Sequence, residues 1–125
     1  MIRNMSNYKY DLEKRLIQFV VDVILAFGKL DGNYSYQHLS KQLIRSTTSA
    51  ALNYGEAQSS ESTRDFIHKM KICLKELRES LVNLKIQKRA QLIKTIGKGD
   101  MLLKENNELI AIFVTSIRTS EKNNK

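Results

Sequence analysis

The chain contains no proline and only five glycines in 125 residues. Proline removes a backbone donor and breaks helices, and glycine is the residue that most readily permits tight turns. A chain short of both residues is poorly suited to a fold of many short strands. The shortage therefore predicts long, uninterrupted helices.

Hydrophobic periodicity predicts four helices, at about residues 8–30, 37–57, 62–90 and 100–120. In each of them apolar residues recur at the i, i+4 and i+7 spacing of one helical face. Short connections between long helices favour antiparallel neighbours. The prediction is an all-α protein, an antiparallel up-down four-helix bundle that forms a single domain over residues 1–125.

Local signals refine the ends and faces of these helices. Ser62 stands three residues before Asp65, in an arrangement similar to a capping box. Gly97 and Gly99 are expected to interrupt the chain, so that Asp100 caps the fourth helix. In the first helix Val21 and Leu25 widen the apolar stripe, which predicts that this helix is covered on more than one side.

The composition limits the cellular setting. The single cysteine, Cys73, excludes an intramolecular disulfide and a multi-cysteine metal site, and it falls on the apolar stripe of the third helix. The first 14 residues lack the apolar core of a signal peptide. The longest apolar run, residues 19–27, is too short to span a membrane and contains Asp22. We expect a reduced, soluble, cytoplasmic protein without a membrane partner.

Positive charge is concentrated in the second half of the chain. Of the formal net charge of +8, residues 66–125 contribute most, with thirteen basic and six acidic residues. Five cations lie at helical spacing on the third predicted helix, opposite its apolar stripe: Lys71, Lys75, Arg78, Lys85 and Arg89. They span about 27 Å at 1.5 Å per residue, a length comparable to a run of phosphates. A solvated helix face explains this pattern equally well, and binding of RNA or DNA is the functional alternative.

A polar stripe marks the second predicted helix, in the segment RSTTSAALNYGEAQ. Arg45, Ser49, Asn53 and Glu56 lie at about 0°, 40°, 80° and 20° around the helix axis. Charged and amide groups at a packed surface require partners. We expect the stripe to be a structural network at a helix or subunit junction, with Arg45 paired to Glu79. Ligand binding is less favoured, and catalysis is the least favoured alternative.

The segment LSKQLIRSTTSAALNYGEAQSSESTRDF, residues 39–66, resembles the four-helix bundle proteins encoded in intervening sequences of bacterial 23S rRNA genes. That family was once described as ribosomal-protein-like. Its pattern of Arg, then Ser, then Asn-x-x-Glu, and a Phe early in the next helix is matched by Arg45, Ser49, Asn53, Glu56 and Phe66. The family's later Glu is matched by Glu79, and the clear resemblance covers residues 39–84.

The resemblance implies a homo-oligomer, with a pentamer favoured, and no established catalytic activity. A related group serves as accessory proteins to reverse transcriptases of diversity-generating retroelements, and that group binds nucleic acid. The chain departs from the family pattern at Ala57, where the family has Gly, and at Gly55 just before Glu56. Close helix contact or a local kink is the expected reason for a glycine at position 55, and the end of the second helix is left open.

Signals for catalysis are weak. His38 has no accompanying ligand set, so no metal site and no cofactor are expected. Arg64 and His68 are similar to an Arg–His motif of all-helical ribonucleases, but they stand too close together. The residues together with what the resemblance implies predict a non-enzymatic, homo-oligomeric protein that binds RNA or DNA through the five cations of the third helix. The alternative is a protein-interaction scaffold or accessory subunit.

Overall fold

The structure is a computed structural model that describes residues 5–29, 32–93 and 96–124. Four α-helices occupy these residues: α1 (Met5–Phe27), α2 (Tyr34–Gln58), α3 (Thr63–Arg89) and α4 (Ile96–Asn123). The described residues contain no strand. The protein is therefore all-α, as the shortage of proline and glycine predicts.

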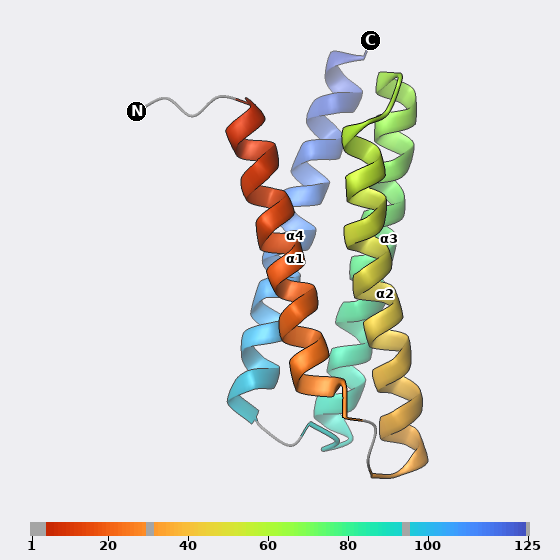
Figure 1. Cartoon of the computed structure of the whole chain (residues 1–125), viewed down its shortest axis with the longest axis vertical. Helices are drawn as coiled ribbons and strands as arrows, with labels where there is room; N and C mark the ends of the chain where they lie inside the picture. The colour runs from red at the N-terminus through yellow and green to blue at the C-terminus, as the bar shows by residue number, and fades with distance from the viewer. Residues whose placement is uncertain (1–4, 30–31, 94–95, 125) are drawn as a thin grey trace.

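The helices alternate in direction along the chain, so α1 begins and α4 ends at the same end of the bundle (Figure 1). Each helix packs against two neighbours in the order α1, α2, α3, α4, and α4 closes the ring against α1. This is the predicted antiparallel up-down four-helix bundle. One face of every helix supplies the core, whose largest fully buried apolar side chains are Leu16, Phe19, Phe27, Leu43, Tyr54, Met70, Leu77, Leu84, Leu109 and Phe113.

The helix ends follow local capping chemistry. The side chain of Asn33 accepts a hydrogen bond from the backbone N–H of Tyr36, so α2 begins earlier than predicted. The Ser62 hydroxyl accepts one from the N–H of Asp65, which confirms the predicted cap of α3. The first helix ends at Phe27 rather than residue 30, which itself lies outside the described residues.

The start of α4 differs from the prediction. Gly97 and Gly99 lie inside the helix, which begins at Ile96. Asp100 is therefore not a cap, and its Oδ1 instead lies 2.7 Å from the Nζ of Lys88 at the end of α3. A Cβ at position 99 would lie 3.0 Å from the Cδ1 of Ile93, so this glycine permits close packing of the preceding segment.

Two further expectations about packing are not met within a single chain. Val21 and Leu25 are 39% and 70% exposed, so α1 is not covered on more than one side within a single chain. At Gly55 an added Cβ would meet nothing within 4 Å, so close helix contact within the chain is not the reason for this glycine, and the alternative, a local kink, stays a prediction. Helix α2 continues through Gly55 and ends at Gln58.

Candidate nucleic-acid interface

The polar stripe of α2 lies at the edge where α2 meets α3. The guanidinium of Arg45 contacts two carboxylates of α3, with Nη1 3.2 Å from Glu76 Oε2 and Nη2 3.2 Å from Glu79 Oε2. The predicted contact between Arg45 and Glu79 is thus present. The second partner, Glu76, is not predicted from the sequence; its side chain is only 9% exposed, so it is the more buried of the two.

The other members of the stripe do not join this ion-pair cluster. Asn53 donates through Nδ2 to the backbone carbonyl of Ser49 at 2.9 Å and to its hydroxyl at 3.2 Å. Glu56 is exposed, and its Oε2 lies 3.5 Å from Lys69 Nζ on α3. The stripe is therefore three separate local contacts, two of which connect α2 to α3.

A shallow groove of about 780 Å³ adjoins the stripe on its outer side. It is lined by Arg45, Ser49, Asn53 and Glu56 together with Ile44, Thr48 and Leu52. Leu52 is 66% exposed. The stripe thus borders an open surface of mixed polarity and is not enclosed within one chain.

The outward face of α3 carries the five predicted cations, and all five are exposed. Lys71 Nζ lies 3.2 Å from Glu121 Oε2 on α4, in a pair of half-exposed side chains. Within the part of the chain that the structure describes, no ion pair is formed by the other four: Lys75, Arg78, Lys85 and Arg89. Their charges therefore face solvent without a neutralising carboxylate.

Arg64, which is not among the cations predicted from the sequence, extends this cationic face toward the start of α3. It lies seven residues before Lys71, so the two positions differ by about 20° around the helix axis. Arg64 is also exposed. The seven-residue spacing is the signal that could have identified it.

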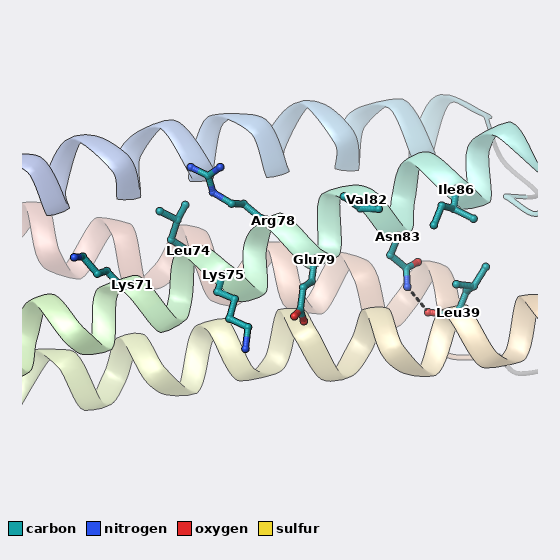
Figure 2. A pocket seen from close by; sticks show the side chains of 9 residues that line it. All are labelled: Leu39, Lys71, Leu74, Lys75, Arg78, Glu79, Val82, Asn83 and Ile86. Atoms are coloured by element: carbon teal, nitrogen blue, oxygen red, sulfur yellow. Dashed lines mark hydrogen bonds between the residues drawn. The ribbon is translucent and has the colours of Figure 1, made fainter.

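Apolar side chains interrupt the cationic face. Val82 and Ile86 are 55% and 46% exposed on the outer side of α3. With Leu39 of α2 and six more residues of α3 they line a shallow groove of about 680 Å³ (Figure 2). The face is therefore cationic along its length but apolar near one end.

The remaining candidate residues do not form a catalytic arrangement. His38 stacks on Tyr34 with ring centroids 5.8 Å apart, and His68 is exposed on α3. Burial raises the pKa of the Cys73 thiol to about 12, so this cysteine is a poor nucleophile at neutral pH. No group of three His, Cys, Asp or Glu side chains among the described residues could hold a metal ion. None of the helices in the described ranges is long and apolar enough to cross a membrane.

The geometry defines a class of protein, a four-helix bundle with one helix presenting a cationic outer face. The chain matches the 23S rRNA-intervening sequence protein family over residues 9–115 and belongs to that family. A crystal structure of a protein of unknown function from the S23 ribosomal protein family of Bacteroides thetaiotaomicron is similar in fold. Its TM-score is 0.79 at 26% identity, over 88% of this chain and 97% of that one. Comparison with curated proteins gives no match.

Proposed function

We propose that this protein binds the phosphate backbone of RNA or DNA through the outward face of α3 and catalyses no reaction. The observation that carries the proposal is a row of exposed cations that form no ion pair with any residue the structure describes, namely Lys75, Arg78, Lys85 and Arg89. Lysine and arginine side chains that neutralise phosphates release condensed counterions, which drives association. No aromatic side chain lies among these cations, so the expected contacts are with phosphates and not with stacked bases.

We also propose that the protein acts as a homo-oligomer, with a pentamer as the assembly that the family resemblance favours. Support comes from the outer surface of α1, where Ile17, Val21 and Ile24 follow the i, i+4, i+7 spacing of one face. They are 48%, 39% and 43% exposed. An apolar stripe left open in one chain is a suitable contact surface for a second chain. In an assembly the cationic faces would be repeated, which would strengthen attraction to a polyanion.

Binding is tested by titrating labelled duplex DNA and RNA with the protein at several salt concentrations. Five phosphate contacts predict that log K falls against log salt with a slope of about −4 to −5 on duplex DNA. The double variant Lys85→Gln, Arg89→Gln should weaken binding and reduce the slope by about 2. The control variant Lys104→Gln, Lys122→Gln removes two exposed charges of α4 and should leave the slope nearly unchanged.

Three results would count against the proposal. If the protein binds neither DNA nor RNA at low salt, the proposed nucleic-acid binding is wrong. Cleavage of RNA by the purified wild-type protein would show that it is an enzyme. A mass of 14.4 kDa in light scattering at micromolar concentration, which is that of one chain, would contradict the proposed homo-oligomer.

A further inference from the structure

A shallow groove of about 680 Å³ runs along the outer face of α3, and its two ends differ in chemistry. One end is apolar, with Val82 and Ile86 of α3 beside Leu39 of α2. Figure 2 shows this end, where the Nδ2 of Asn83 donates a hydrogen bond of 2.8 Å to the carbonyl of Leu39. The bond joins the two helices that form the apolar end.

The other end of the groove is basic. Lys71, Lys75 and Arg78 line it, with Leu74 between them. In Figure 2 Arg78 points toward α4 and Lys75 toward α2, so cationic groups border the groove on both sides. The groove's single carboxylate, Glu79, is already paired with Arg45 at 3.2 Å.

Neither water nor a phosphate backbone would interact favourably with both the apolar end and the basic end of the groove. Phosphates would neutralise the cations but would gain little from contact with two exposed aliphatic side chains. An amphipathic helix that carries carboxylates beside an apolar stripe would satisfy both ends, since helices commonly lay their apolar face into such grooves. The distance along α3 from Lys71 to Ile86 is about 22 Å, which corresponds to about four turns of a partner helix.

We propose that this groove binds an acidic amphipathic helix of a partner protein, with apolar residues over Val82, Ile86 and Leu39 and carboxylates over Lys75 and Arg78. Binding of the helix goes beyond the proposed nucleic-acid binding and does not depend on it; only the competition described next rests on that proposed function. Because a phosphate backbone would also contact Lys75 and Arg78, the helix and nucleic acid would compete for this part of α3. The partner helix would therefore regulate access of RNA or DNA to α3.

The test is a fluorescence-anisotropy titration of the full chain with a labelled synthetic peptide of about 16 residues. The peptide places Leu at helical i, i+4, i+7 and i+11 positions and Glu beside them, and a scrambled peptide of the same composition is the control. We expect the ordered peptide to bind and the scrambled peptide to bind at least about tenfold more weakly. Duplex DNA should displace the ordered peptide.

Matched variants separate this inference from nucleic-acid binding. The variant Val82→Ser, Ile86→Ser should weaken peptide binding about tenfold and leave DNA affinity unchanged. The variant Lys85→Gln, Arg89→Gln alters cations that do not line the groove, and it should weaken DNA binding only. Circular dichroism verifies that both variants are folded.

Several outcomes overturn the inference. They are failure of the ordered peptide to bind, equal binding of the scrambled peptide, and peptide affinity that is unaffected by Val82→Ser, Ile86→Ser. If DNA binds and the peptide does not, the inference fails and the proposed function stands. If the peptide binds and neither DNA nor RNA does, the proposed function fails and the inference stands.

Discussion

Arg45 on α2 forms an ion pair with Glu76 on α3, and Glu76 is the far more buried partner, with 9% of its side chain exposed against 54% for Arg45. The carboxylate of Glu76 thus depends on Arg45 for compensation of its charge. Glu79, the second partner of Arg45, is 43% exposed and remains hydrated. The ion pair of Arg45 with Glu76 is therefore expected to contribute to the free energy of unfolding, whereas its ion pair with Glu79 contributes little.

Removal of Arg45 is expected to destabilise the bundle through Glu76. Arg45→Met should lower the free energy of unfolding by about 1–2 kcal/mol, because it leaves a largely buried carboxylate without its cation. Urea denaturation followed by circular dichroism measures the loss. Glu79→Gln is the control and should cost less than about 0.5 kcal/mol. Equal losses for the two variants would show that Glu76 has no special dependence on Arg45.

Replacement of Gly55 is expected to stabilise the protein. Gly55 lies inside α2, and a Cβ there would meet no atom within 4 Å. Gly55→Ala should raise the free energy of unfolding by about 0.5–1 kcal/mol, because alanine loses less backbone entropy on folding. Gly99→Ala is the matched control and should give no gain, since its Cβ would crowd Ile93. A loss of stability in Gly55→Ala would point to a contact that one chain does not contain, such as a subunit interface.

The backbone just after the end of α3 is strained at Gln91, and a substitution there should relieve the strain. Gln91 has a φ of 57°, a left-handed conformation that favours glycine. The N–H groups of Gln91 and Leu92 donate to the carbonyls of Lys88 and Gln87 at 3.1 and 2.8 Å, which is the hydrogen-bond pattern of a Schellman motif. Gln91→Gly should therefore raise the free energy of unfolding by about 1 kcal/mol. Gln91→Ala retains a Cβ and should leave the thermal midpoint nearly unchanged; an equal rise in both variants would contradict the argument.

Alkaline pH is expected to destabilise the protein through Cys73. Burial raises the pKa of this thiol from 9.0 to about 12, so above pH 9 the unfolded chain releases a proton that the folded chain retains. The stabilising contribution is complete below the unfolded pKa and is lost as pH rises toward the folded pKa. Between about pH 8 and about pH 10.5 the loss should amount to about 2 kcal/mol.

The variant Cys73→Ala isolates this contribution, because the other groups that titrate in alkali remain. Its free energy of unfolding should fall less steeply with pH than that of the wild type. The difference between the two slopes in chemical denaturation is the quantity to measure. Parallel pH profiles would show that the thiol does not contribute.

The sequence predicts the bundle well because the spacing of apolar residues alone identifies the face of each helix that is buried. The cap of α3 at Ser62 and the outward cations of α3 follow from spacing in the same way. The start of α4 could not be predicted, since two glycines close together resemble a break. In the structure Gly99 is tolerated because Ile93 packs against it. The buried partner of Arg45 was missed because Glu76 and Glu79 both lie on the side of α3 that faces α2.

The sequence by itself determined the number of helices, their alternation and the side of each helix that faces inward, because these depend on interactions within a few turns. Only the tertiary structure decided which carboxylate Arg45 shields, which apolar residues of α1 and α3 remain exposed, and where a groove opens between cations and aliphatic side chains. Those features depend on the rotation and separation of neighbouring helices. The rotation and separation of two helices are set by the packing of all the side chains between them, so a local sequence pattern does not determine them.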